Sequence, residues 1–150
     1  RDKVGMVTFR GDSAELVLPP TGSIEAAAVR LSELPHGGRT PLAEGLECAA
    51  QVLATEAVKD PTRRPILVLL SDGRATAGKG ALARSKAVAD ALAMRGFDCV
   101  VIDCETGPMR LGLARDLAVR LGAELIPMAE LDPAAITDVV RGSLQAKEVA

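Results

Sequence analysis

The chain opens with two short apolar segments separated by a turn. Residues Lys3–Phe9 are mostly apolar and include β-branched side chains, which is typical of a strand. Residues Arg10–Ser13 have the composition of a turn, and a second apolar segment, Ala14–Leu18, ends at Pro19 and Pro20. This pattern predicts an antiparallel hairpin at the start of the chain.

Two segments with helical spacing of apolar residues follow the hairpin. Ser23 is a suitable N-cap for a helix over Ile24–Leu34. The apolar stripe of this helix consists of Ile24, Ala27, Ala28, Leu31 and Leu34. Thr40 can cap a second helix that runs to about Val58, with Pro41 at its first position, where a missing N–H costs no hydrogen bond. Its expected buried face consists of Leu42, Leu46, Ala49, Ala50 and Leu53.

The rest of the chain alternates short apolar runs with longer helical segments. The run Pro65–Ser71 is continuous, as is typical of a strand covered on both faces. A helix, a strand, a helix, a short strand and a helix are expected over Ala81–Arg95, Phe97–Asp103, Arg110–Leu121, Ala123–Pro127 and Asp132–Ala146. Such alternation indicates parallel β-α-β units. We therefore expect a doubly wound α/β fold: a mostly parallel sheet with one antiparallel edge hairpin and helices on both faces.

Composition narrows the classes of function. A chain of 150 residues that is 48% hydrophobic fits one folded domain, and no apolar run approaches the roughly 18 residues of a membrane span. With a net charge of −2, two Phe and no Tyr or Trp, it lacks the basic surface and stacking platforms of nucleic-acid binders. Three cysteines without C-x-x-C spacing argue against a disulfide framework or zinc site and favour the cytoplasm.

Two residues stand where an α/β sheet presents its ligands. Ligands bind outside the carboxyl ends of the strands, where Asp72 follows the run Ile66–Leu70. Asp72 can accept N–H groups from its own turn, or it can bind a divalent cation. Thr40 has the same two interpretations, as a helix cap or as a hydroxyl ligand. The doublet before it, Gly37-Gly38, permits a close backbone approach that a helix cap does not need.

Two enzymatic alternatives have weaker support. Residues Gly73–Gly80 match the pattern G-x-x-x-x-G-K, but Gly80 stands where a phosphate-binding loop needs Ser or Thr. Asp72 would also place a carboxylate beside the phosphates. The single histidine, His36, lies in a glycine-rich turn, and no G-x-S-x-G elbow is present. We therefore assign no catalytic residue, and nucleotide binding by Gly73–Gly80 remains the minor alternative.

Three segments together resemble a known family. In order and spacing, Lys3–Phe9, Gly37–Leu42 and Ile66–Gly73 are similar to the von Willebrand factor type A domain. The resemblance implies a metal-ion-dependent adhesion site for a divalent cation, usually Mg²⁺, formed by a D-x-S-x-S loop, a Thr and an Asp. It places the Thr role on Thr40 and the Asp role on Asp72.

The D-x-S-x-S loop does not occur in this sequence. In the family it lies on the strand before the one that opens this chain. We therefore expect residues 1–150 to be a von Willebrand type A domain that lacks its first strand and helix. The metal site would be incomplete and would bind Mg²⁺ weakly or not at all.

A finer resemblance concerns Phe9–Gly11, Leu16–Thr21 and Leu34–Ala43. These segments are similar to the C-terminal module of the magnesium chelatase D subunit and its cobaltochelatase-like relatives. The resemblance implies a non-catalytic module of a tetrapyrrole metal chelatase, of chlorophyll or cobalamin type. Its partners would be an AAA+ subunit and a large porphyrin-binding subunit, with oligomerisation through an AAA+ module outside this chain. The alternative is a generic bacterial protein-interaction domain of the same family.

Overall fold

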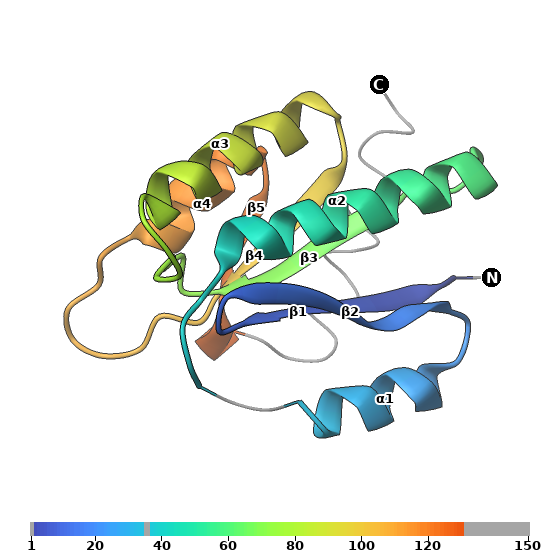
Figure 1. Cartoon of the computed structure of the whole chain (residues 1–150), viewed down its shortest axis with the longest axis horizontal. Coiled ribbons are helices and arrows are strands. Elements are labelled where there is room, and N and C mark those ends of the chain that lie inside the picture. The colour runs from blue at the N-terminus through green and yellow to red at the C-terminus, as the bar shows by residue number, and fades with distance from the viewer. Residues whose placement is uncertain (1, 35–36, 131–150) are drawn as a thin grey trace. The chain divides into compact units, whose positions relative to one another are not determined.

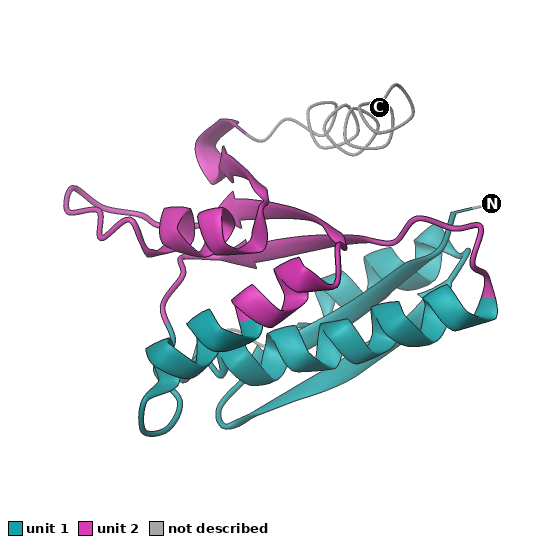
Figure 2. Ribbon diagram, turned by 90° about the horizontal axis from the view of Figure 1, so that it is seen from above, with its two compact units in different colours: residues 1–59, 75–88 teal, residues 60–74, 89–150 magenta. Residues whose placement is uncertain are grey.

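The computed structural model describes residues 2–34 and 37–130. His36 and the helix expected over residues 132–146 lie outside this part. The chain divides into two compact units (Figure 2). Unit 1 comprises residues 1–59 and 75–88, and unit 2 comprises residues 60–74 and 89–150. Each unit is described by itself.

Unit 1 begins with the predicted hairpin. Strand β1 (Val4–Arg10) pairs antiparallel with β2 (Ser13–Thr21). The expectation that Pro19 and Pro20 end the second strand is wrong, because β2 continues through both. Pairing is irregular near β1 residues Val4 and Met6, and β2 has only β1 as a partner among the described strands. An edge strand with an irregular register tolerates residues that lack an N–H donor.

Two helices pack on opposite sides of the hairpin (Figure 1). Helix α1 (Ile24–Ser32) is capped as predicted, since Ser23 Oγ accepts a hydrogen bond from Ala26 N at 3.1 Å. Its expected apolar stripe is not a core face: Ile24 is 77% exposed and Leu31 is 61% exposed. Helix α2 (Leu42–Lys59) carries the larger buried face. Four of its five expected core residues are buried, namely Leu42, Leu46, Ala49 and Ala50.

Unit 2 is built on a parallel sheet, as predicted. Its strands are β3 (Ile66–Ser71), β4 (Asp98–Asp103) and β5 (Glu124–Pro127), in that order, and α4 (Leu113–Leu121) packs on β4 and β5. Helix α3 (Ala81–Met94) belongs to both units, and a 3-10 turn (Met128–Glu130) follows β5. The α/β class is confirmed, but the described strands form two sheets instead of the single sheet expected.

The two parallel strands β3 and β4 differ in burial. Residues Cys99–Ile102 of β4 are all buried, because β4 has a neighbouring strand on each side. In β3, Leu69 is buried, whereas Leu70 is 52% exposed. The expectation that the continuous apolar run of β3 is covered on both faces is therefore wrong, and the pattern describes β4 better.

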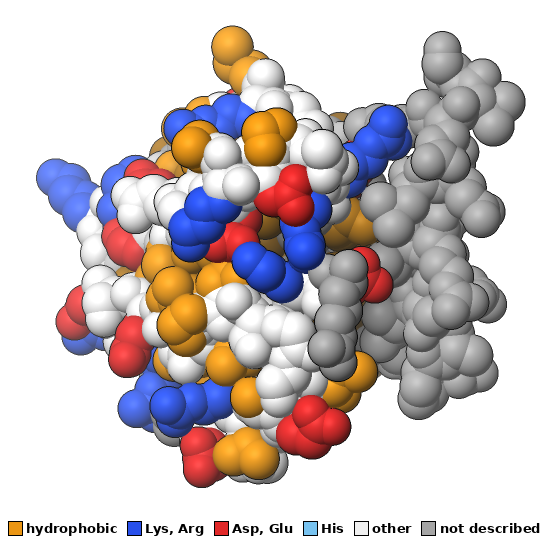
Figure 3. Space-filling view, turned by 90° about the vertical axis from the view of Figure 1, so that its right-hand side faces the viewer, with side chains coloured by type: hydrophobic (Ala, Val, Ile, Leu, Met, Phe, Trp, Pro, Cys, Tyr) orange, Lys and Arg blue, Asp and Glu red, His pale blue; other side chains and the backbone are white. Residues whose placement is uncertain are grey.

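One face of the molecule carries side chains of both charges. On the face drawn in Figure 3, basic and acidic side chains are interspersed with hydrophobic ones. No helix in the described part of the chain combines the length and hydropathy needed to cross a bilayer.

The packing of α2 on β1 generates the first prediction. Gly45 is buried in α2, and a Cβ added there would lie 2.5 Å from Cδ1 of Phe9. Gly45→Ala should therefore destabilise the chain by about 1–2 kcal/mol, since overpacking outweighs the gain of about 1 kcal/mol in helix propensity. In a Phe9→Leu background the same change should cost less. Urea unfolding followed by circular dichroism measures both effects, and equal costs in the two backgrounds would contradict the packing argument.

Candidate metal-binding site

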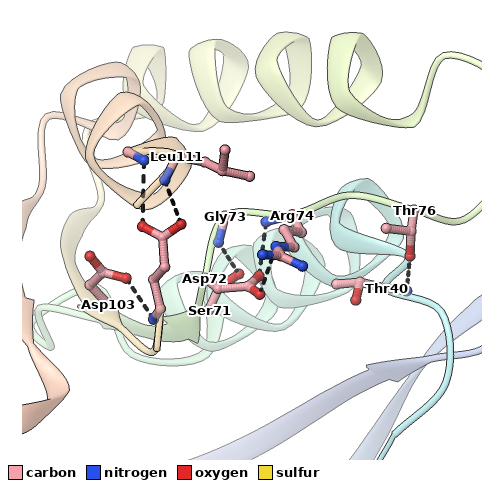
Figure 4. A network of polar contacts seen from close by, with 10 residues as sticks. Thr40, Ser71, Asp72, Gly73, Arg74, Thr76, Asp103 and Leu111 are labelled. Atoms are coloured by element: carbon pink, nitrogen blue, oxygen red, sulfur yellow. Dashed lines mark hydrogen bonds and ion pairs between the residues drawn. The ribbon is translucent and has the colours of Figure 1, made fainter. Parts of the chain in front are cut away.

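Asp72 lies in a turn that its own side chain helps to form (Figure 4). At the end of β3, Ser71 Oγ accepts a hydrogen bond from Gly73 N at 2.9 Å. One residue on, Asp72 Oδ1 accepts a hydrogen bond from Arg74 N at 3.0 Å. Two successive side-chain-to-backbone turns of this kind stabilise the loop locally. The turn-forming interpretation of Asp72 is therefore confirmed.

The Asp72 carboxylate is not saturated by this turn. Its second oxygen, Oδ2, lies 3.4 Å from Arg74 Nε, and the side chain is 35% exposed. An ionised carboxylate has about four lone-pair directions, so one backbone hydrogen bond and one long ion pair leave room for another ligand. Turn formation and cation binding are thus compatible at Asp72.

Gly73 brings this turn against helix α4. Its backbone has φ +76°, a conformation that favours glycine. A Cβ at this position would clash with the backbone of Leu113 and Ala114 and would lie 2.7 Å from the Leu113 carbonyl oxygen. The absence of a side chain at Gly73 is therefore what allows the Asp72 turn to lie on the first turn of α4.

Glu105 closes the neighbouring loop after β4, and the sequence analysis did not identify it. Its side chain is buried, with Oε1 accepting a hydrogen bond from Leu111 N at 2.6 Å and Oε2 one from Gly112 N at 3.4 Å. Gly112, with φ +69°, precedes the first residue of α4, so this helix starts at Leu113 and not near Arg110 as expected. A carboxylate at the amino end of a helix is also stabilised by the helix dipole. The only sequence signal is an acidic residue seven positions before the glycine that caps a helix.

Acidic groups gather at the carboxyl ends of β3 and β4. Asp103 Oδ1 accepts a hydrogen bond from Glu105 N at 2.9 Å, and Cys104 N donates one to Ser71 O at 3.1 Å. Burial, and then the negative charges of Asp103 and Asp72, raise the pKa of the Cys104 thiol. The thiol therefore stays protonated at neutral pH.

Thr40 is held in unit 1 through its backbone. Thr40 N donates a hydrogen bond to Thr76 Oγ1 at 2.8 Å, and Thr40 O accepts hydrogen bonds from Thr76 N at 3.1 Å and Ala77 N at 3.4 Å (Figure 4). Among the described residues, none forms a hydrogen bond with the Thr40 hydroxyl, so the expected helix cap is not observed. This hydroxyl is available to a ligand.

Arg84 fixes the loop that holds Thr40. Its Nη1 donates a hydrogen bond to Glu44 Oε1 at 2.7 Å and its Nη2 donates one to Ala77 O at 3.0 Å. A hydrogen bond from the Glu44 backbone, and then the Arg84 guanidinium, lower the pKa of Glu44. Because Thr76 N and Ala77 N donate to Thr40, they are not free to bind phosphate. This disfavours the nucleotide-binding interpretation of Gly73–Gly80.

Thr40 and Asp72 offer the type of oxygen atom that a divalent cation binds, but two residues supply fewer ligands than such an ion needs. A hydroxyl and a carboxylate are the hard oxygen ligands that Mg²⁺ prefers, but the ion takes six. In the part of the chain that the structure describes, no group of three or more His, Cys, Asp or Glu residues is arranged to hold a metal ion. Thr40 belongs to unit 1 and Asp72 to unit 2. The described residues therefore offer a partial ligand set.

The close approach of Gly73 generates the second prediction. Gly73→Ala should lower the free energy of unfolding by more than about 3 kcal/mol, because the clash with α4 adds to the cost of positive φ. Gly96 is the matched control, with φ +74° and no atom within 4 Å of an added Cβ. Gly96→Ala should cost only about 1–2 kcal/mol. Circular dichroism during urea unfolding gives both values, and similar losses would contradict the close-approach argument.

The family of this chain is identified by comparison with known proteins. The family model for the von Willebrand factor type A domain matches residues 1–74. The chain is 47% identical to the uncharacterized protein Rv2850c of Mycobacterium tuberculosis, over 95% of this chain and 23% of that protein. It is 34% identical to the uncharacterized protein MJ0910 of Methanocaldococcus jannaschii, over 94% of this chain and 83% of that protein.

A third relative is named for its function. The chain is 37% identical to the magnesium-chelatase 60 kDa subunit of Cereibacter sphaeroides, over 96% of this chain and 26% of that subunit. The chain thus spans about a quarter of the length of this subunit and of Rv2850c.

Solved structures show the same fold. The conserved hypothetical protein BatB from Bacteroides thetaiotaomicron matches with a TM-score of 0.71 and 19% identity, over 96% of this chain and 80% of that one. The SpRpn10 VWA domain matches with a TM-score of 0.58 and 16% identity, over 84% of this chain and 64% of that one. The chain belongs to the von Willebrand factor type A domain family and is similar to the corresponding part of magnesium-chelatase subunits.

Proposed function

We propose that this chain is a metal-dependent protein-binding module of an ATP-dependent metal chelatase subunit. The observation that carries the proposal is the 37% identity to a magnesium-chelatase subunit over 96% of the chain. In this role the domain couples an AAA+ motor to the porphyrin-binding subunit during tetrapyrrole biosynthesis. It takes no part in metal insertion itself, and its setting is the cytoplasm.

Thr40 and Asp72 are the proposed metal ligands. The Thr40 hydroxyl has no described partner, and the Asp72 carboxylate has unused lone pairs, which supports this role. Water and residues outside these 150 supply the remaining ligands. A bound Mg²⁺ supplies a positive charge with exchangeable coordination positions, which suits reversible contact with oxygen atoms of a partner protein.

The chain's own residues prepare these two ligands before any metal arrives. Ser71 and Gly73 orient Asp72. The Ser71 hydroxyl accepts a hydrogen bond from Gly73 N, and the absence of a side chain at Gly73 lets the turn lie on α4. Thr76 orients Thr40 by hydrogen bonds in both directions. Thr40 is therefore fixed through its main chain, which leaves its hydroxyl free to bind. Asp72 uses one carboxylate oxygen to form its own turn and keeps the other for a ligand.

A second candidate is a general protein-interaction domain unrelated to chelation. The chain covers 83% of MJ0910, so in that relative the domain makes up most of the protein and leaves no room for an AAA+ module. Under this candidate Thr40 and Asp72 keep their roles and the partners differ. Binding to purified chelatase subunits separates the two candidates.

Magnesium titration tests the ligand assignment. We expect amide signals of the Asp72 turn to shift in ¹⁵N NMR spectra with a Kd on the order of 1 mM, because few protein ligands and a single charge give weak binding. Asp72→Asn should abolish the shifts, and Thr40→Ala should weaken binding severalfold. Asp90→Asn removes a more exposed carboxylate of unit 2, which also forms an ion pair with an arginine, and should change nothing. Micromolar affinity, or shifts that survive Asp72→Asn, would contradict the assignment.

Assembly tests the proposed partners. The chain is mixed with purified AAA+ and porphyrin-binding chelatase subunits of the same organism, with Mg²⁺ or with EDTA. We expect a complex in size-exclusion chromatography that needs Mg²⁺ and is lost in Asp72→Ala and Thr40→Ala, while circular dichroism shows both variants folded. A complex that forms equally in EDTA would exclude a metal-dependent contact, and no complex in any condition would favour the general interaction domain.

A further inference from the structure

Arg74 makes the most direct contact with the proposed metal ligand Asp72. The two residues share one turn, and they interact twice. Arg74 N donates a hydrogen bond to Asp72 Oδ1 at 3.0 Å, and Arg74 Nε lies 3.4 Å from Asp72 Oδ2. The Arg74 side chain is 52% exposed, so the guanidinium can move into solvent without unpacking a core.

The surroundings of Asp72 favour a cation at this place. Asp103 ends β4 and Glu105 follows it, at the same edge of the sheet as Asp72, since Asp103 pairs in register with Ser71. Both carboxylates accept hydrogen bonds from backbone N–H groups, and neither forms an ion pair within the part of the chain that the structure describes. Among the described residues, only Arg74 forms an ion pair with one of these three carboxylates, that of Asp72.

We infer that the Arg74 guanidinium is an internal competitor for the metal and sets the affinity of Asp72 for a divalent cation. This inference rests on the proposed function. The guanidinium and a metal ion are both attracted by the negative charge at Asp72 Oδ2. Two cations next to the same oxygen atom repel each other. Metal binding therefore displaces the Arg74 side chain.

The turn survives this displacement because its two interactions come from different parts of Arg74. The hydrogen bond to Asp72 Oδ1 comes from the Arg74 backbone, and the ion pair to Oδ2 comes from the side chain. Ser71 Oγ and Gly73 hold the rest of the turn. Exchange of guanidinium for metal thus changes the occupant of one oxygen and leaves the loop in place.

The expected effect is modest, because exposed ion pairs contribute little. Removing the guanidinium should tighten Mg²⁺ binding about threefold to fivefold, the range that an exposed pair supports. Arg74→Gln removes the charge and keeps a long polar side chain. Arg120→Gln is the matched control, because Arg120 forms an ion pair with Asp90 in the same unit, at the other end of α4.

The test is a magnesium titration of the wild-type chain, Arg74→Gln and Arg120→Gln, followed by amide signals of the Asp72 turn and by the Arg74 Nε–H signal. We expect tighter binding only in Arg74→Gln. In the wild type, the Nε–H signal should move toward that of a free arginine with the same midpoint as the amides. Equal affinities in the three proteins, or an Nε–H signal that does not move while the amides do, would overturn the inference alone. No binding in any of the three would overturn both the inference and the proposed metal function.

Discussion

The close approach of Gly73 to the first turn of α4 is the constraint on which the organisation of unit 2 depends. It joins the end of β3 to the start of α4, and only a residue without a side chain and with positive φ satisfies it. Ser71 and Asp72, the two residues before Gly73, then accept hydrogen bonds from the backbone N–H groups of Gly73 and Arg74. In the loop after β4, Glu105 does the same for the amides before α4. The site is therefore held by side chains that accept hydrogen bonds from their own loops.

A common principle links the two proposed ligands. Thr40 is fixed through its amide and carbonyl by Thr76, whereas its hydroxyl forms no hydrogen bond with the residues that the structure describes. Asp72 commits one oxygen to its own turn and the other to an exposed guanidinium. A hydroxyl without a partner and a carboxylate with a weak, mobile one suit reversible binding better than permanent metal storage. This agrees with a domain that makes and breaks contacts.

The sequence predicted much of this fold because its signals are local. The hairpin, the Ser23 cap and the parallel order of the last three strands follow from turn residues, capping chemistry and periodicity. Burial was harder to predict, since the apolar stripe of α1 includes two exposed residues, Ile24 and Leu31. Whether an apolar stripe is covered depends on tertiary partners that the stripe does not encode. The Asp72 turn is one of the two interpretations that the sequence predicts. The role of Glu105 is not predicted, because its two carboxylate oxygens accept hydrogen bonds from backbone amides that lie six and seven residues further along the chain.

We propose that Thr40 and Asp72 are both ligands of a divalent cation. Paramagnetic Mn²⁺, used in place of Mg²⁺, tests it most directly, because it broadens the NMR signals of nuclei close to the ion. We expect amide signals around Thr40 and Thr76, and those of Gly73 and Arg74, to broaden together at the same low Mn²⁺ concentration and to recover on addition of excess Mg²⁺. Broadening at only one of the two loops, or broadening spread evenly over exposed acidic residues, would contradict the claim.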